Sequence, residues 1–223
     1  MVALGLTIKW LGHACFLITT MAGTNIVFDP YPIEVGRRLP AISGDVVFVS
    51  HSHSDHSAVG ALKSSRNVIR PLSGKSTDKG SFKLHNEVIY YKSILTYHDG
   101  LKGKRRGTNT VRLIVADGVR ICHLGDLGHV LTASQVKAVS PVDVLMIPVG
   151  GVYTIDGATA KKVVQQLKPK YVIPMHYKTP WLKVELQPAD GFVKGYKHVK
   201  HADRLVVSKD SLPKETTVVV LKY

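Results

Sequence analysis

The chain has 223 residues, of which 44% are hydrophobic and 21% charged, so it is long enough to bury a core without covalent staples. Its formal charge of +14 favours an anionic partner, either nucleic acid or a small anionic substrate attracted by a positive field. It contains no run of about 18 apolar residues and only two cysteines, so we expect no membrane partner, no disulfide framework and a cytoplasmic location.

The first half of the chain predicts mainly strands. The apolar N-terminal segment lacks a basic region and contains Lys9 and His13, so it indicates a buried strand rather than a signal peptide. A continuous β-branched run at 46–49 predicts a strand buried on both faces, and residues 58–63 could begin a short helix. Asp117-Gly118 predicts a hairpin turn. The other strands are expected at 6–11, 14–19, 25–28, 68–70, 88–95, 110–115 and 119–123.

The second half alternates strands with helices. Thr132 and Gln135 form a capping-box pattern that opens a helix ending near Val139. Thr154 or Asp156 caps a second helix that ends at 168–169. Strands are expected at 142–147, 171–174, 205–208 and 217–222, and the spacing of His198 and His201 suits one exposed helical face. The pattern predicts a single α+β domain over residues 1–223, with two packed sheets and helices outside.

The segment 50–57 reads SHSHSDHS and directly follows the predicted strand at 46–49. His51 and His53 lie two residues apart, so both side chains can point to the same side and grip one metal ion. Asp55 and His56 can turn back to hold a second ion. Imidazole and carboxylate donors without a thiolate suit zinc, manganese or iron.

Further ligands are needed because one short cluster supplies too few donors for two ions. His98, Asp126 and His176 each follow an apolar segment that predicts a strand. Donor residues placed repeatedly at strand ends predict a shared site at one rim of a β-sandwich.

His51-x-His53-x-Asp55-His56, followed by a lone His, a Gly-Asp pair and a final His, resembles the metallo-β-lactamase superfamily of binuclear hydrolases. The opening WLGHACFLI and the segments 25–30, 125–128 and 148–154 resemble its ascorbate-6-phosphate lactonase-like branch. The resemblance extends to about Tyr177.

This resemblance implies an αββα sandwich of two mixed β-sheets flanked by helices, with two divalent ions at one edge. Zinc is the expected metal, with manganese and iron as alternatives. In the implied ligand set, His51, His53 and His98 hold the first ion, Asp55, His56 and His176 hold the second, and Asp126 bridges them. His rather than Glu at position 53 speaks against the oxygen-reducing flavodiiron relatives.

Other residues receive expected roles around this ligand set. Asp55 is also the candidate catalytic residue, because it can orient the nucleophile. His13, Tyr153 and Thr154 are candidate substrate contacts, although His13 equally suits a core position and Thr154 a helix cap. Asp29 is expected to accept a hydrogen bond from a ligand imidazole or from the ligand loop, or to serve only in a turn. Relatives often carry His where this chain has Val152, which points to a different substrate, and the segment 178–204 has no clear counterpart.

The leading functional hypothesis is a hydrolase that uses a bridging hydroxide between two ions to cleave a small anionic ester, lactone or phosphoester. Basic residues of the segment 102–106 could steer such a substrate toward His98. A nuclease or phosphodiesterase acting on RNA or DNA is the alternative that the high charge favours. A non-catalytic metal-binding or regulatory protein is the third hypothesis, and a homo-oligomer is compatible with each of them.

Overall fold

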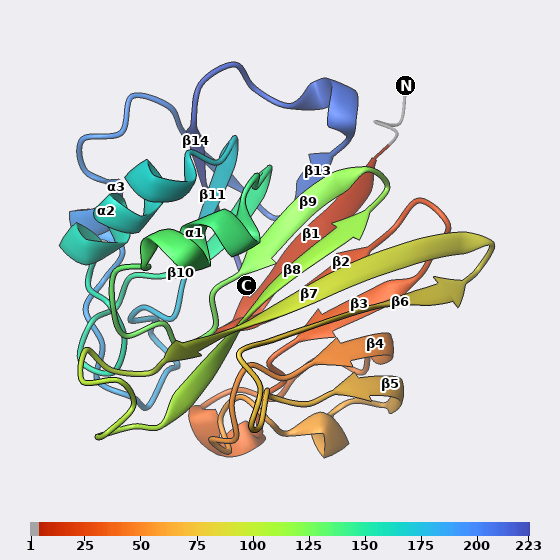
Figure 1. Ribbon diagram of the computed structural model, residues 1–223, viewed down its shortest axis with the longest axis horizontal. Helices are drawn as coiled ribbons and strands as arrows, with labels where there is room; N and C mark the ends of the chain where they lie inside the picture. The colour runs from red at the N-terminus through yellow and green to blue at the C-terminus, as the bar shows by residue number, and fades with distance from the viewer. Residues whose placement is uncertain (1–4) are drawn as a thin grey trace.

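Two mixed β-sheets pack face to face in the computed structural model, which describes residues 5–223 (Figure 1). The six-stranded sheet has the order β13-β1-β2-β3-β4-β5, and the eight-stranded sheet has the order β12-β14-β11-β10-β9-β8-β7-β6. The strands of the first sheet are β1 (Leu6–Gly12), β2 (Cys15–Thr19), β3 (Asn25–Phe28), β4 (Ser43–Phe48), β5 (Ser64–Ile69) and β13 (Leu205–Val207). Those of the second are β6 (Thr77–Leu84), β7 (Glu87–Tyr97), β8 (Thr108–Ala116), β9 (Val119–His123), β10 (Val144–Pro148), β11 (Tyr171–Met175), β12 (Val199–Ala202) and β14 (Thr217–Leu221).

The helices are few and short. They are α1 (Ala133–Val139), α2 (Gly157–Leu167) and α3 (Asp190–Val193), with 3₁₀ turns at Ile33–Val35, Val59–Ala61 and Lys209–Ser211. Thr132 and Gln135 form the predicted capping box of α1, and Asp156 rather than Thr154 caps α2. None of the helices within residues 5–223 combines the length and apolar character needed to cross a membrane.

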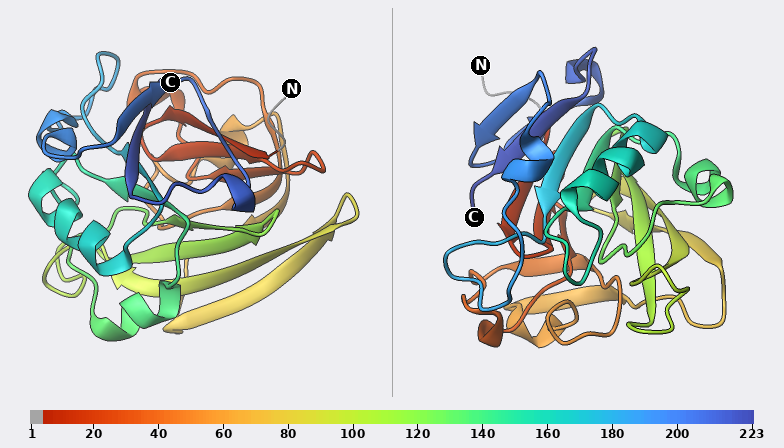
Figure 2. Two further views of the ribbon diagram at one scale, coloured as in Figure 1. Left: turned by 90° about the horizontal axis from the view of Figure 1, so that it is seen from above. Right: turned by 90° about the vertical axis from the view of Figure 1, so that its left-hand side faces the viewer.

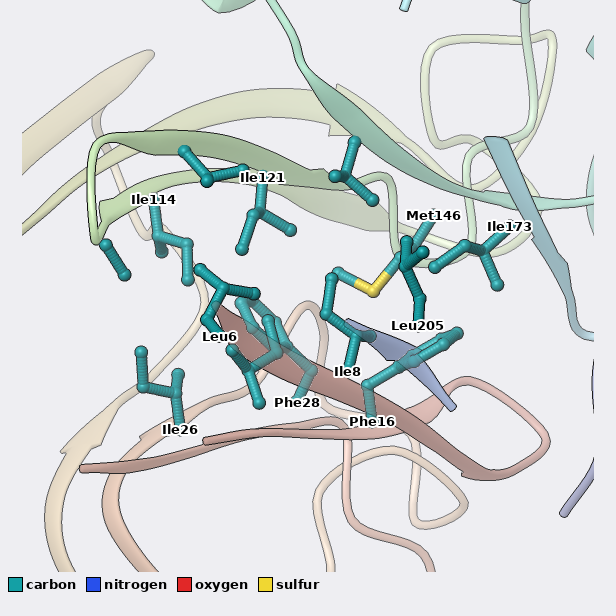
Figure 3. Close-up of a cluster of buried hydrophobic side chains, with 14 of the residues drawn as sticks. Leu6, Ile8, Phe16, Ile26, Phe28, Ile114, Ile121, Met146, Ile173 and Leu205 are labelled. Atoms are coloured by element: carbon teal, nitrogen blue, oxygen red, sulfur yellow. The ribbon is translucent and has the colours of Figure 1, made fainter. Parts of the chain in front are cut away.

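The main core lies between the two sheets, where alternate side chains of β1 face the other sheet. Leu6, Ile8 and Trp10 are buried, while Lys9 between them is exposed. Figure 3 shows Leu6 and Ile8 in one buried cluster with Ile121 and Met146 of the opposite sheet. Because successive side chains of a strand point to opposite faces, this alternation gives the strand one buried face. By contrast, β10 and β11 are buried throughout, as the continuous apolar runs of the sequence predicted.

The outer faces of the two sheets are covered differently. Helices α1 and α2 lie on the outer side of the eight-stranded sheet (Figure 2). There, Val163 and Leu167 of α2 belong to one buried cluster with Leu145 and Val172 of the strands. The outer face of the six-stranded sheet is covered by loop segments that contribute Tyr31, Leu182 and Leu186. The predicted α+β sandwich of two mixed sheets with flanking helices is thus confirmed.

Three local predictions need comment. The interpretation of His198 and His201 as a helical pair was wrong, because β12 pairs in parallel with β14 and places His201 opposite Val220. Strand β6 was missed because its exposed face is polar and only alternate residues turn inward. The apolar N-terminal segment forms the predicted buried strand, β1, from Leu6 onward. Residues 1–4 of that segment lie outside the described part of the chain.

Candidate metal centre

Strand direction brings the candidate ligands to one edge of the sandwich. β8 runs antiparallel to both β7 and β9, and β9, β10 and β11 are mutually parallel, so β7, β9 and β11 end at the same edge. His98, Asp126 and His176 follow these three ends. The loop that carries His51 follows β4 of the other sheet. The site therefore forms where the carboxyl ends of strands from both sheets meet.

Asp126 is the point on which the histidines converge. Its Oδ2 atom lies 3.1 Å from Nε2 of His98, 3.2 Å from Nε2 of His176, 3.3 Å from Nε2 of His56 and 3.9 Å from Nε2 of His51. One carboxylate thus faces imidazole nitrogens from both halves of the ligand set that the sequence predicted.

Two groups of donors correspond to the expected ligand triads. His51, His53 and His98 offer ligand atoms that all lie within 4.8 Å of one another. The second group contains Asp55, His56 and His176 and, in addition, His13, within the same limit. The structure therefore brings together every residue of the two expected ligand triads and adds one imidazole to the second.

The chemistry of these donors fits divalent cations. Burial, with nearby His56, lowers the pKa of His51 to about 3, and burial also lowers the pKa of His53, so both imidazoles are neutral with a free lone pair. Asp126 keeps a pKa well below its usual value although burial acts to raise it, because His176 and His56 lie beside it. The buried atoms Nε2 of His56 and Oδ1 of Asp126 lack a hydrogen-bond partner within residues 5–223. A bound metal ion would supply the missing partner of such buried nitrogen and oxygen atoms.

Asp29 fixes the orientation of the His56 and His51 imidazoles through their Nδ1 atoms. Its carboxylate accepts hydrogen bonds from the backbone N–H of Ser50 at 2.7 Å and from the Ser50 hydroxyl at 2.6 Å. Nδ1 of His56 lies 3.1 Å from Asp29 Oδ2, and Nδ1 of His51 lies 2.9 Å from Ser50 Oγ. When both Nδ1 atoms carry the hydrogen, both Nε2 atoms present lone pairs toward Asp126. Of the two interpretations of Asp29, this geometry corresponds to the hydrogen-bonding one.

Asn109 of β8 holds the loop that carries Asp126. Its amide donates to the Leu124 carbonyl at 2.9 Å, and its Oδ1 accepts from the Asp126 backbone N–H at 3.0 Å. Gly125 between them has φ +53°, and a Cβ there would collide with Asn109 and Ser50. Glycine is therefore required at this close approach.

His13 lies inside the site rather than at its rim. It is buried with φ +53°, and its Nε2 lies 3.1 Å from Asp55 Oδ2. The ring centroid is 4.3 Å from that of His176 and 4.7 Å from that of His56. Burial, with His176 nearby, lowers the pKa of His13 to about 4. A neutral His13 can thus donate to Asp55, which a residue enclosed in the apolar core could not.

A pocket of about 360 Å³ opens onto the site. We call it the site pocket, and its lining residues are His53, Asp55, His98, Arg106, Asp126, Tyr153, His176 and Val184. Tyr153 is 41% exposed and contributes to this wall. The Thr154 hydroxyl instead donates to the Ile155 carbonyl and is not part of the lining. Val184 comes from the segment 178–204, for which the sequence offered no interpretation.

Two residues near the site, His123 and Trp181, have structural contacts. His123 is buried, with Nε2 2.9 Å from the Ala14 carbonyl, and it stacks on Phe28. Trp181 packs against Tyr31 and Tyr223 rather than on the site pocket.

Sequence reasoning missed the supporting roles of Ser50 and Asn109. Ser50 stood within the SHSHSDHS motif but carried no signal that distinguished it from the other serines. Asn109 adjoins the predicted strand at 110–115, and a polar residue at the start of a strand was the only available hint.

Comparison with known proteins gives a consistent result. The family model described as the β-lactamase superfamily domain matches residues 7–176. A UPF0173 metal-dependent hydrolase of Thermoplasma acidophilum is 30% identical over 78% of this chain and 84% of its own length. A UPF0173 metal-dependent hydrolase of Carboxydothermus hydrogenoformans is 29% identical over 77% of this chain and 84% of its own length.

Solved structures show the same relationship. A Thermotoga maritima protein assigned to the Zn-dependent hydrolases of the metallo-β-lactamase superfamily is 36% identical, with a TM-score of 0.75 over 97% of this chain and 98% of that one. Short-form human tRNase Z is 13% identical, with a TM-score of 0.55 over 78% of this chain and 93% of that one, which shows a shared fold alone.

Proposed function

The chain belongs to the β-lactamase superfamily and is a metal-dependent hydrolase, and we propose that it cleaves a small anionic ester, lactone or phosphoester with two divalent ions. The observation that carries this proposal is the position of Asp126 between two groups of donors. Nε2 of His98 and Nε2 of His176 lie 3.1 and 3.2 Å from the same carboxylate oxygen, although they belong to different groups.

Each group of donors suits one ion. His51, His53 and His98 would hold the first, and Asp55, His56 and His176 the second, with Asp126 shared between them. Zinc is the metal we expect, because the donors are imidazoles and carboxylates and because the Thermotoga maritima relative is described as Zn-dependent. Two such ions supply a nucleophilic water of lowered pKa and offset negative charge on the substrate oxygens.

The residues of the chain organise the rest of the reaction. Asp55 is one-third exposed and lines the site pocket, so its carboxylate can accept a proton from a water molecule and orient that water toward the substrate. Burial acts to raise the pKa of Asp55, but the hydrogen bond from His13 and the charge of His56 outweigh it, so the carboxylate stays ionised. The hydrogen bond from His13 also prevents rotation of this carboxylate.

The dimensions of the site pocket favour a small substrate. Its volume of about 360 Å³ lies near the lower end of the range for small-molecule sites, which begins at about 300 Å³. A larger hollow of about 480 Å³ between α2 and the segment 194–196 is lined by Lys161, Lys168 and Lys194. Its lining, within the described residues, contains no histidine, cysteine or carboxylate, so it lacks the groups that hydrolysis needs.

The test is hydrolysis by protein reconstituted with zinc, manganese or iron. A simple lactone, 4-nitrophenyl phosphate and bis(4-nitrophenyl) phosphate would be compared, and bound metal would be counted by mass spectrometry. We expect lactone or monoester cleavage that Asp126→Ala abolishes, with loss of bound metal. Asp203→Ala is the matched control, because that carboxylate is 84% exposed and forms a surface ion pair with Lys222.

The remaining outcomes separate the alternatives. Cleavage of the diester alone would contradict the small-ester proposal and favour the phosphodiesterase hypothesis, which the net charge of +14 supports. Metal bound without turnover of any substrate would favour a metal-binding or regulatory protein.

A further inference from the structure

Arg106 is a cation on the wall of the site pocket. Among the described residues that line this pocket, it is the only lysine or arginine. Its side chain is half-buried, unlike those of Lys104 and Arg105 beside it, which are exposed. Arg106 therefore lines the same space as His98 and His176 and is less exposed than its two neighbours.

The guanidinium of Arg106 has no ion-pair partner among residues 5–223. Arg120, by comparison, pairs with Asp143 at 2.8 Å, and Lys209 reaches the same carboxylate at 3.0 Å. No aspartate or glutamate within residues 5–223 forms an ion pair with Arg106, and its only hydrogen bond to them uses its backbone N–H. A half-buried arginine with free donors is suited to an oxyanion, which it can hold with two parallel hydrogen bonds.

Asp99 builds the loop that presents Arg106. This buried carboxylate accepts backbone hydrogen bonds from Leu101 at 2.7 Å, Gly103 at 3.0 Å, Arg105 at 2.9 Å and Arg106 at 2.8 Å. The loop is therefore fixed by main-chain contacts that leave its cationic side chains free. Asp99 sits directly after His98, so the same turn places the ligand imidazole and the arginine.

Tyr153, which follows β10 at the same edge, supports the guanidinium of Arg106. The Cζ atom of Arg106 lies 5.3 Å from the centroid of the Tyr153 ring, within cation–π range. Gly151 and Val152 before it both have φ +61°. This conformation is unfavourable for a β-branched residue, so the backbone at Val152 is strained where it turns Tyr153 into the wall of the site pocket.

We infer that Arg106, held against Tyr153, binds a non-reacting oxyanion group of the substrate, a carboxylate or a phosphoryl group. The inference rests on the proposed function, because it assigns the part of the substrate that is not cleaved. The scissile bond would lie over Asp126 and Asp55, and the anionic group would reach the opposite wall. Val184, also in the lining, offers an apolar surface to the carbon chain between them.

Arg105 provides a matched control for Arg106. Both residues donate a backbone N–H to Asp99, and they are adjacent in the same loop. The Arg105 side chain is exposed and is not part of the lining of the site pocket. Arg105→Ala therefore removes the same charge from the loop without removing the proposed contact.

The test is binding of non-hydrolysable probes to the zinc-loaded protein by isothermal titration calorimetry. The probes are phenylphosphonate and benzoate, with uncharged benzamide as the neutral comparison. Phenylphosphonate can also be attracted by metal ions, so the informative quantity is the change in Kd between variants. We expect Arg106→Ala to raise the Kd of at least one anion by about 10- to 100-fold, because losing a hydrogen bond to a charged group typically changes binding by about this factor. Arg106→Lys should lose part of this affinity, and Arg105→Ala should change the Kd by less than about 2-fold.

The two anions identify the recognised group, and three results would overturn the inference. These are failure of the wild-type protein to bind either anion, unchanged binding by Arg106→Ala, and an equal loss with Arg105→Ala, which would indicate a diffuse field. Thermal unfolding of each variant separates lost contacts from lost folding. Esterase assays on the same preparations separate the two proposals. Arg106-dependent binding without turnover would contradict only the proposed function, whereas turnover with Arg106-independent binding would contradict only the oxyanion contact.

Discussion

Nδ1 of His56 lies 3.1 Å from Oδ2 of Asp29, and both side chains are fully buried. The same carboxylate accepts from the Ser50 hydroxyl, which in turn contacts Nδ1 of His51. One buried acid therefore aligns an imidazole from each donor group. Asp29 contacts His56 directly and His51 through Ser50, so it couples the orientations of the two imidazoles.

Replacing Asp29 with Asn should disturb metal binding more than folding. At nearly constant volume, the amide nitrogen of Asn would oppose a donor in either orientation: the Ser50 backbone N–H at the Oδ1 position, or Ser50 Oγ and His56 Nδ1 at the Oδ2 position. We expect zinc affinity to fall by about 10- to 100-fold and the free energy of unfolding to fall by about 1–3 kcal/mol. Competition with a chromophoric chelator and urea unfolding measure the two effects. Asp210→Asn, at an exposed position, is the control, and equal zinc affinity in both variants would contradict the role of Asp29.

Asn109→Ala should loosen Asp126. It removes the acceptor of the Asp126 backbone N–H and the donor to the Leu124 carbonyl, both of which are buried. We expect a loss of about 1–3 kcal/mol in the free energy of unfolding and weaker zinc binding. Asn67→Ala is a matched control, because Asn67 also donates to a backbone carbonyl at 2.9 Å but lies on β5. If both variants lose zinc affinity equally, Asn109 has no specific effect on the site.

The ion-free protein should be most stable near about pH 6.5, the ordinary pKa of histidine. Burial lowers the pKa of His51 to about 3 and that of His13 to about 4. As pH falls, the unfolded chain therefore takes up protons on these two histidines before the folded protein does. Stability is therefore lost as pH falls from about 6.5 toward 3, by about 3–5 kcal/mol per residue at full titration. Burial disfavours charge on His56 as well, but Asp126 and Asp29 raise its pKa well above the ordinary value. Its contribution is full below about pH 6.5 and is lost as pH rises through the raised pKa.

Differential scanning calorimetry between pH 4 and 9, with and without a chelator, measures this dependence. With zinc bound, we expect the decline above pH 6.5 to disappear, because the metal replaces the proton on His56. A Tm of the ion-free protein that rises steadily to pH 9 would contradict the assignment.

Val152→Gly should stabilise the fold and weaken oxyanion binding. Glycine removes the strain of a β-branched residue at φ +61°, a cost of about 1–2 kcal/mol that is partly offset by greater freedom of the unfolded chain. Tyr153 would be held less firmly, so Arg106 would lose part of its support. Urea unfolding and calorimetric titration with phenylphosphonate measure both effects. Val130→Gly, at another exposed valine without positive φ, should only destabilise. An equal loss of stability in both variants would show that Val152 is not strained.

Much of the site could be predicted from the sequence because its information is local. His51, His53 and His56 are neighbours in the chain, and the runs before His98 and His176 are apolar enough to predict strands that end at those residues. Period and composition decide such elements, since each depends on residues only a few positions apart. The buried strands β10 and β11 followed from the same kind of pattern.

Long-range pairing decided the rest. β12 is a strand only because β14 lies beside it, and the spacing of His198 and His201 contains no trace of that partner. Ser50 and Asn109 acquire their roles through Asp29 and Asp126, which are 21 and 17 residues away in the chain. Arg106 and Tyr153 meet only because the turns after β7 and β10 project over one edge. The sequence by itself thus determined which donors the protein carries and that they end strands. The tertiary structure decided which atoms face one another, because burial and hydrogen bonding across two sheets depend on the whole chain.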